Sequence, residues 1–149
     1  MTAVIQRVKE ASVTIDGKLY SNIGKGLLVL LGIHKTDSES IAKAFAKKII
    51  DLRIFSDEEE KMNLNVKDID GEVLVISQFT LCTDNGKSGN RPSFFSAELP
   101  ERANQLYSLH ITELKEYYDQ SKIKNGEFAA RMDIKLINEG PVTIILQKN

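Results

Sequence analysis

Apolar and polar residues alternate along the first part of the chain in the pattern of β-strands. From Ala11 to Asp16 every second residue is apolar, which is the period of a strand with one buried face. Asp16-Gly17 is a hairpin signal, so residues 19–23 are expected to return antiparallel to this strand. Residues 27–33 are apolar at almost every position and predict a central strand that is buried on both faces.

Two later segments carry apolar residues at helical spacing. The first follows Asp37 and Ser38, either of which can cap a helix, and its apolar positions run from Ile41 to Ile50. The second begins at Pro100, because proline is favoured in the first turn, and its apolar stripe extends to Tyr117. These patterns predict two main helices.

The remaining apolar runs complete the predicted sheet. A strand is expected over residues 72–79, and two more are expected on either side of a Gly-Pro step, at residues 132–136 and 144–146. Six to eight strands joined mostly as hairpins, with two helices, predict an α+β fold. We expect a curved, barrel-like, mostly antiparallel sheet and a single domain over residues 1–149.

Composition narrows the possible environments and partners. A formal net charge of −1 provides no general attraction to nucleic acid, so any such contact must be local. Cys82 is the single cysteine, which excludes an intrachain disulfide framework and fits a reducing compartment. The first residues carry no signal-peptide pattern, and the longest apolar run, residues 27–31, is too short to span a bilayer. The chain is therefore expected in the cytoplasm, without a membrane partner.

Familiar catalytic patterns are missing from the sequence. His34 and His110 lack the neighbouring ligands of a metal site, and each is interpreted as structural. No phosphate-binding glycine loop or nucleophile-elbow motif is present. Cys82 follows an apolar strand and is expected to be a buried, inert thiol. We therefore expect neither a metal nor a cofactor.

Ser77-Gln78-Phe79-Thr80-Leu81 is a candidate site because polar groups and an aromatic ring follow an apolar strand. Backbone N–H groups freed where a strand ends can stabilise an oxyanion, and Phe79 can stack on a base. Thr80 could be a nucleophile only with an activating base, which the local sequence lacks. The alternative is a strand whose polar edge faces water. The following loop carries Lys87 and Arg91, which could contact a phosphate or simply be exposed.

Residues 138–143, Asn-Glu-Gly-Pro-Val-Thr, have two interpretations. A Gly-Pro step between apolar runs is typical of a turn that joins two strands. The same step can form a stiff loop, because proline has a fixed φ and glycine has no side chain. Such a loop presents carbonyl oxygens with little steric bulk and could test a small ligand at close range.

Both segments resemble the two signature motifs of the D-aminoacyl-tRNA deacylase family, also called the D-tyrosyl-tRNA deacylase family. The resemblance extends over essentially the whole chain, including residues 7–13, 26–32, 52–55, 61–64 and 89–94. It implies an enzyme that hydrolyses the ester between a D-amino acid and the 3′-terminal adenosine of tRNA, releasing both. It also implies a homodimer with active sites at the subunit interface, and glycyl-tRNA mischarged on tRNA-Ala as a possible substrate.

The resemblance also implies roles for individual residues. The Gly140-Pro141 bond would be cis, and its carbonyls would exclude L-amino acids from the partner subunit's site. Backbone N–H groups at Phe79 and Thr80 would hold the ester carbonyl, with the adenosine 2′-hydroxyl assisting the reaction. The substrate pocket would include Ser77, Gln78, Leu81, Gly140 and Pro141, with Arg7 and Met132 holding the loop.

Two other functions remain open from the sequence. The missing acid–base groups also suit a non-catalytic module that binds RNA ends. The near-neutral charge suits a small-ester hydrolase unrelated to RNA.

Overall fold

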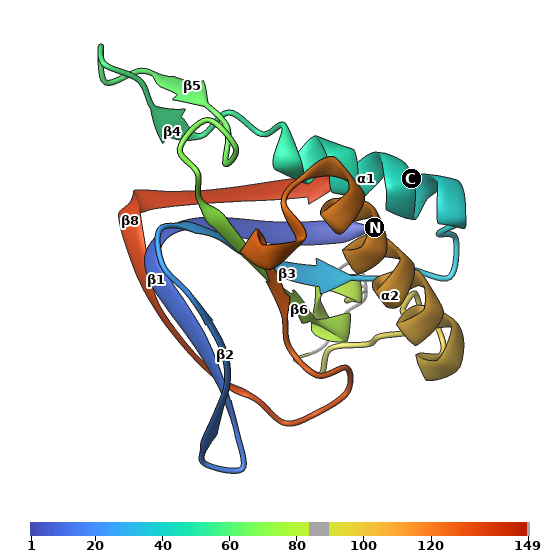
Figure 1. Ribbon diagram of the computed structural model, residues 1–149. Coiled ribbons are helices and arrows are strands. Elements are labelled where there is room, and N and C mark those ends of the chain that lie inside the picture. Colours follow the sequence, from blue (N-terminus) through green and yellow to red (C-terminus); the bar gives the residue numbers. More distant parts are fainter. Residues whose placement is uncertain (84–89, 149) are drawn as a thin grey trace.

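The computed structural model describes residues 1–83 and 90–148. Within these ranges the chain forms a six-stranded mixed sheet, a two-stranded sheet and two α-helices (Figure 1). The strands are β1 (Thr2–Ile15), β2 (Lys18–Ile23), β3 (Gly26–Gly32), β4 (Phe55–Ser56), β5 (Met62–Leu64), β6 (Glu72–Ser77), β7 (Ile123–Asn125) and β8 (Asp133–Gln147). The helices are α1 (Glu39–Ile50) and α2 (Pro100–Tyr117), with the 3-10 helices η1 (Phe79–Cys82) and η2 (Gln120–Lys122).

Strand β1 organises the sheet. It pairs with β8 along nearly its whole length, while its first half pairs with β3 on the other edge and its second half pairs with β2. These pairings are antiparallel, and β3, β6 and β7 continue the sheet in parallel. On the far side Ser21 Oγ of β2 donates to the Asn125 carbonyl of β7 at 3.2 Å, which brings the two edges of the sheet together. The expected α+β fold with a curved, barrel-like sheet is confirmed.

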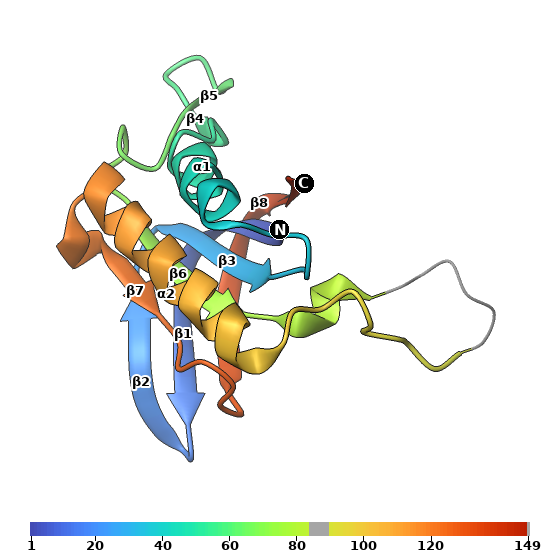
Figure 2. The same ribbon diagram turned by 90° about the vertical axis from the view of Figure 1, so that its right-hand side faces the viewer.

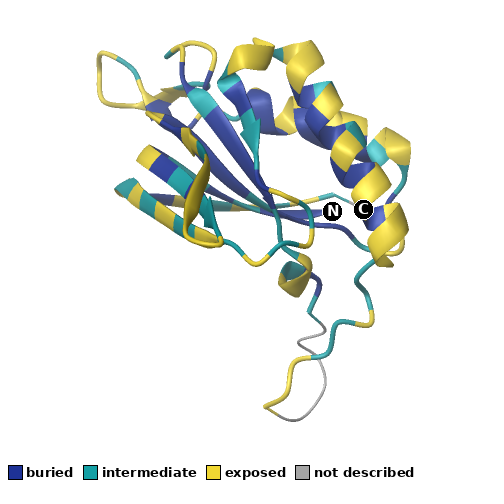
Figure 3. Ribbon diagram, turned by 60° about the horizontal axis from the view of Figure 1, so that its bottom comes forward, coloured by how far each residue is buried: buried dark blue, intermediate teal, exposed yellow. Residues whose placement is uncertain are grey.

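Both faces of β3 are buried, as its apolar sequence predicts. Leu27, Val29 and Leu31 face the core that α1 and α2 cover, whereas Leu28 belongs to a second core on the concave side of the sheet. The helices lie on the same side of the sheet (Figure 1) and turn their buried residues toward it (Figure 3). Helix α1 is capped by the Ser38 hydroxyl, which accepts a hydrogen bond from the Ile41 N–H at 3.4 Å.

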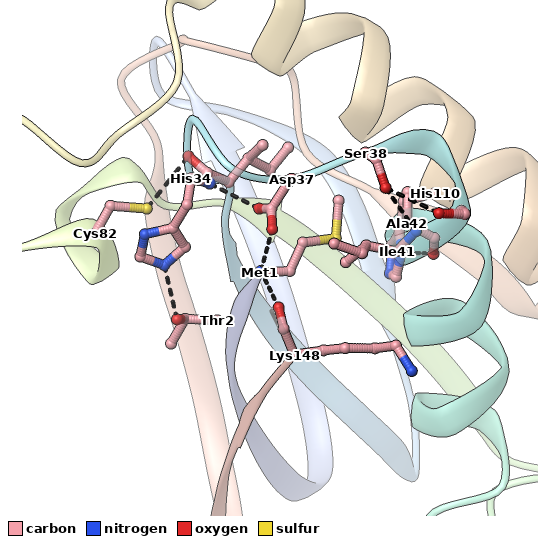
Figure 4. Close-up of polar contacts among 12 residues, drawn as sticks. Met1, Thr2, His34, Asp37, Ser38, Ile41, Ala42, Cys82, His110 and Lys148 are labelled. Atoms are coloured by element: carbon pink, nitrogen blue, oxygen red, sulfur yellow. Dashed lines mark hydrogen bonds and ion pairs between the residues drawn. The ribbon is translucent and has the colours of Figure 1, made fainter.

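The start of β1 and the end of β3 are tied together by a buried polar cluster (Figure 4). The Met1 ammonium pairs with Asp37 Oδ1 at 2.5 Å and donates to the Lys148 carbonyl at 2.6 Å. Asp37 Oδ2 accepts from the His34 N–H at 2.7 Å, and His34 Nε2 lies 2.9 Å from Thr2 Oγ1. A buried ion pair is costly unless its polar atoms are hydrogen-bonded, and here those bonds join the start of β1 to the segment after β3. The cluster therefore holds the segment that follows β3 in place.

His110 is buried between α1 and α2, and this burial is expected to make folding stability depend on pH. Its Nδ1 lies 3.0 Å from the Ala42 carbonyl oxygen, and its Nε2 has no hydrogen-bond partner in the described part of the chain. Burial lowers the pKa of His110 to about 4, whereas an unfolded histidine titrates near 6.5. Between these two pKa values His110 is protonated in the unfolded chain and neutral in the folded chain. We expect stability to fall between about pH 6.5 and pH 4, with a His110 contribution of up to about 1.4 kcal/mol per pH unit.

Urea unfolding at pH 7 and pH 5 measures this loss. His110→Gln removes the titrating group, so the loss between the two pH values should be smaller in this variant. An unchanged pH dependence in His110→Gln would show that other groups cause it.

Two local expectations differ from the structure. The strand predicted over residues 72–79 ends at Ser77, because η1 begins at Phe79. Residues 138–143 lie within β8, which stays antiparallel to β1 on both sides of the Gly-Pro step. The interpretation of this segment as a turn that joins two strands is therefore wrong.

Candidate functional site

A pocket of about 490 Å³ opens where β6 ends and η1 begins. Its wall is largely apolar, with contributions from both cores, from the start of α2 and from the segment before β8. The lining residues are Leu31, Ile33, Ile76, Ser77, Gln78, Phe79, Ala97, Glu98, Pro100, Ala103, Phe128, Ala129, Ala130, Met132 and Ile134. Four residues that the sequence predicts for the site therefore meet here: Ser77, Gln78, Phe79 and Met132.

The 3-10 helix η1 is held against the end of β3. The Gln78 N–H donates to the Leu31 carbonyl at 2.8 Å, and the Cys82 thiol donates to the Ile33 carbonyl at 3.3 Å. Gly32 lies directly beneath η1, since a Cβ built on Gly32 would be 2.9 Å from Leu81 Cβ and 3.1 Å from the Gln78 carbonyl oxygen. Gly32 is a positioning residue that the sequence analysis missed, although a glycine inside a strand pattern often marks close backbone approach.

Thr80 and Leu81 do not line the pocket, although both belong to η1. The Thr80 hydroxyl is exposed and accepts a hydrogen bond from the Gln78 side-chain amide. Leu81 packs on Gly32, so its role is to seat η1. The first N–H groups of a helix have no partner within the helix, and in η1 these are the N–H groups of Phe79 and Thr80.

Ionisable groups contribute little to the pocket. Glu98 is the one ionisable side chain among the described lining residues, and its carboxylate is already engaged by Arg102 Nε at 3.3 Å and by the Leu99 N–H at 2.8 Å. Burial raises the pKa of the nearby Cys82 thiol to about 11, so Cys82 stays protonated. Among residues 1–83 and 90–148, the pocket wall therefore offers backbone, hydroxyl and amide groups, and its one carboxylate, Glu98, is already paired.

The Gly-Pro segment forms a bulge in the β1–β8 ladder. Val8 pairs with Asn138 and Gln6 pairs with Thr143, so residues 139–142 face Arg7 alone. The Gly140-Pro141 peptide bond is cis, and Gly140 has a φ of +131°.

Asn138 closes the base of this bulge, a role that the sequence analysis did not assign. Its Oδ1 accepts from the Val142 N–H at 2.9 Å, and its Nδ2 donates to Thr143 Oγ1 at 3.1 Å. The first and last residues of the motif thus hold its two ends together.

Arg7 holds the bulge against the body of the protein. Its Nε donates to the Glu139 carbonyl at 3.1 Å and lies 3.6 Å from the Glu139 carboxylate, while its Nη1 donates to the Ile54 carbonyl at 2.8 Å. The Arg7 side chain is 11% exposed, so these bonds are partly shielded from water. Met132 lies elsewhere, in the pocket wall beside Gly126.

The bulge and the pocket are separated within one chain. Ser77, at the pocket, pairs with Leu31, and Leu31 pairs with Ala3. The row that contains Arg7 runs through Leu27 to Val73, about 13 Å away along the strands. Gly140 lies beyond β1 as well, and neither Gly140 nor Pro141 is among the described residues of the pocket wall.

The family described as D-Tyr-tRNA(Tyr) deacylase matches residues 4–147. The chain belongs to this family. A protein from Actinobacillus succinogenes named D-aminoacyl-tRNA deacylase is 49% identical over 147 residues, which cover 99% of each chain. Family membership confirms the resemblance stated from the sequence and the assignment of the chain to the deacylase enzymes.

Two solved structures have the same fold. One, titled "c-Myc DNA Unwinding Element Binding Protein", has a TM-score of 0.94 and 41% identity, and the match covers 100% of this chain and 99% of the other. The second, titled "Structural Analysis of a probable eukaryotic D-amino acid tRNA deacylase", has a TM-score of 0.79 and covers 98% and 99% of the two chains. With an identity of 14%, the second comparison supports the fold alone.

In residues 1–83 and 90–148, no group of three or more His, Cys, Asp or Glu side chains could hold a metal ion. No helix of the described chain is long and apolar enough to cross a membrane. Of the two cations that the sequence suggests for phosphate contact, Lys87 lies outside the described residues and Arg91 is exposed.

Proposed function

We propose that this chain hydrolyses the ester between a D-amino acid and the 3′-terminal adenosine of tRNA. The observation that supports this most directly is the apolar pocket, which ends in η1 and whose described lining residues carry polar groups but no acid–base pair. An aminoacyl ester is an activated bond, so a site that orients it and stabilises developing charge can be sufficient for hydrolysis. The cytoplasm is the expected location, because aminoacyl-tRNA is used there.

The proposed reaction depends on backbone groups and on the substrate. The carbonyl oxygen of the ester accepts hydrogen bonds from the Phe79 and Thr80 N–H groups, which the 3-10 helix leaves without internal partners. Water attacks the carbonyl carbon, the bond to the ribose oxygen breaks, and that oxygen takes the proton lost by the water. The neighbouring 2′-hydroxyl of the substrate relays this proton, since the hydrogen-bond partner of the Thr80 hydroxyl in the described part of the chain is the Gln78 amide, which is not a base.

Chirality is proposed to be tested by the Gly-Pro bulge of a second copy. The bulge is separated from the pocket of its own chain by about 13 Å along the strands and by the width of β3 and β1. Its carbonyl oxygens can therefore enter a pocket only when two chains associate, which makes each site incomplete in a monomer. Rejection of the L side chain by a rigid, bulk-free loop is specificity by exclusion. Glycine has no side chain to exclude, so glycyl-tRNA is also a substrate.

Hydrolysis of D-Tyr-tRNA and L-Tyr-tRNA by the purified protein tests this function. We expect rapid release of D-tyrosine and little release of L-tyrosine above the uncatalysed rate. Equal hydrolysis of both esters would contradict the proposed rejection of L-amino acids by the Gly-Pro bulge. Binding of both tRNAs without ester loss would instead support an RNA-end-binding module, and activity on a D-tyrosine ester that lacks adenosine would support a general esterase.

The same assay applied to Thr80→Ala distinguishes hydrolysis assisted by backbone groups and the 2′-hydroxyl from attack by the Thr80 hydroxyl. Retention of most activity is expected if backbone groups and the 2′-hydroxyl carry the reaction. A D-Tyr-tRNA that ends in 2′-deoxyadenosine should then be hydrolysed slowly by the unmodified protein. Complete loss of activity in a folded Thr80→Ala variant would make the hydroxyl the nucleophile.

A further inference from the structure

An exposed aromatic surface lies beside the candidate pocket. We name it the aromatic ledge and define it as Lys35, Phe79, Arg91, Phe94, Phe95 and Leu99. These residues surround a shallow hollow of about 640 Å³, which shares Phe79, Ala97 and Glu98 with the pocket wall. In Figure 2 the segment that leads into α2 runs beside η1, which brings the two parts of the ledge together.

Three apolar side chains of the ledge are largely exposed to solvent. Phe79 is 61% exposed, Phe95 is 75% exposed and Leu99 is 67% exposed. Single exposed apolar residues need no explanation, but a contiguous group beside a pocket indicates a binding surface. The Phe79 and Phe94 rings meet edge to face with centroids 5.1 Å apart, so Phe79 is supported from one side.

The ledge is held by backbone pairing. The Lys35 N–H donates to the Ser96 carbonyl at 3.0 Å, and the Glu98 N–H donates to the Ile33 carbonyl at 2.9 Å. Residues 33–35 and 96–98 therefore run antiparallel and carry Lys35 and Phe95 close to each other. Lys35 Nζ lies 6.0 Å from the centroid of the Phe95 ring. The Phe95 ring and the Lys35 ammonium are therefore carried by two backbone segments that are hydrogen-bonded to each other.

The charge of the ledge suits an anionic ligand. Lys35 and Arg91 are exposed, whereas the nearby Glu98 side chain is 8% exposed and paired with Arg102. The chain as a whole has a net charge of −1, so attraction to a polyanion must come from such a local group. Exposed aromatic rings flanked by cations are the combination that binds single-stranded nucleic acid, by stacking on bases and by contact with phosphates.

We propose that the aromatic ledge binds the unpaired nucleotides that precede the terminal adenosine of the tRNA. This inference rests on the proposed function, which puts that adenosine and its ester in the adjoining pocket. The RNA strand must leave the pocket over its rim, and Phe79 belongs to both surfaces. A base stacks on the Phe95 ring, and Lys35 and Arg91 contact the phosphates on either side of it.

Two D-tyrosyl substrates test the ledge: intact D-Tyr-tRNA and D-tyrosyl-adenosine, which has no preceding nucleotides. For Phe95→Ala we expect KM for D-Tyr-tRNA to rise about tenfold, in line with the loss of one stacked base. Hydrolysis of D-tyrosyl-adenosine should be unchanged. Phe95→Tyr should keep the KM of the unmodified protein, because tyrosine retains an aromatic ring. Lys35→Ala should raise KM for D-Tyr-tRNA and weaken its dependence on salt.

Tyr117→Ala is the matched control, since Tyr117 is an aromatic residue on α2, 40% exposed and outside the ledge. An equal loss on both substrates in Phe95→Ala would overturn the proposal, because the residue would then support the pocket. Unchanged KM for D-Tyr-tRNA would also overturn it. A change in sedimentation in place of a change in KM would identify the ledge as a protein interface.

Failure of the proposed function would be recognised separately. An unmodified protein that leaves both D-tyrosyl substrates intact is not this deacylase. The proposed binding of nucleotides by the ledge is then tested with uncharged tRNA. Its affinity should be about tenfold weaker for Phe95→Ala than for the unmodified chain. Equal binding by the two proteins would overturn the ledge.

Discussion

Gly140→Ala is expected to lower kcat/KM for D-Tyr-tRNA by about 100-fold while the protein stays folded. An added Cβ would lie 2.8 Å from Val142 Cγ2, 3.0 Å from the Val142 nitrogen and 3.1 Å from Arg7 Nη2. Gly140 also has a φ of +131°, which an alanine rarely adopts. The bulge must therefore change shape and move the carbonyls that are proposed to test the substrate. Steady-state kinetics on D-Tyr-tRNA and L-Tyr-tRNA measure both the rate and the discrimination.

Gly17→Ala provides a matched control for the backbone effect. Gly17 also has a positive φ, +75°, but a Cβ there meets no atom within 4 Å. This variant should lose about 1–2 kcal/mol of stability and keep its activity, because it strains a hairpin far from the pocket. If Gly140→Ala keeps full activity and full discrimination, the role proposed for the bulge is wrong.

Arg7→Met is expected to reduce deacylation at least tenfold through the same bulge. The guanidinium spans the Glu139 and Ile54 carbonyls, and methionine fills a similar volume without a donor. Each partly buried carbonyl left without a partner costs about 1–3 kcal/mol, so the bulge should loosen and the thermal midpoint should fall. Arg7→Lys should rescue little, because an ammonium cannot reproduce the two-pronged geometry of a guanidinium.

Arg53→Met is the control variant, because it removes an arginine that does not contact the bulge. Arg53 also donates to a backbone carbonyl, that of Asn63 at 2.6 Å, but it is an exposed residue in the segment that precedes β4. We expect near-normal activity for this variant. Equal activity losses in Arg7→Met and Arg53→Met would contradict a specific role for Arg7. Sedimentation of Arg7→Met that equals that of the unmodified protein would show that the bulge and not the proposed assembly has changed.

The proposed division of the site between two chains has a structural basis. The pocket is built at one end of β3 and β6, while the bulge is built beside Arg7 on the far side of β1. Exposed apolar residues on the outer strands, including Leu19, Ile137 and Ile145, offer a surface that a second copy can cover. A protein kept monomeric should therefore bind the ester without discriminating its chirality.

Much of the secondary structure could be predicted from residue periodicity. Helix α1 begins after Ser38, and α2 begins at Pro100, because capping and first-turn preferences are local. The fully apolar run of β3 correctly indicated burial on both faces, since α1 and α2 cover one side and the second core covers the other. The hairpin at Asp16-Gly17 was also correct, and both residues have positive φ there.

Long-range pairing decided the features that periodicity missed. A Gly-Pro step between apolar runs has the same local pattern in a turn and in a bulge, and the choice depends on β1 running alongside both halves of β8. The closeness of Gly32 to η1 is likewise a contact between segments that are distant in the chain. No local pattern encodes such contacts, because they depend on the positions of the neighbouring strands.

The amino-acid pattern was sufficient for the two helices, the buried central strand, the α+β class and the two motifs that resemble the deacylase family. Those properties follow from side-chain periodicity, capping and motif order, which are local in the chain. The structure was needed to bring Met132 to Ser77, to set Arg7 inside the bulge and to separate that bulge from its own pocket. These arrangements depend on strand register, which is set by packing over the whole sheet.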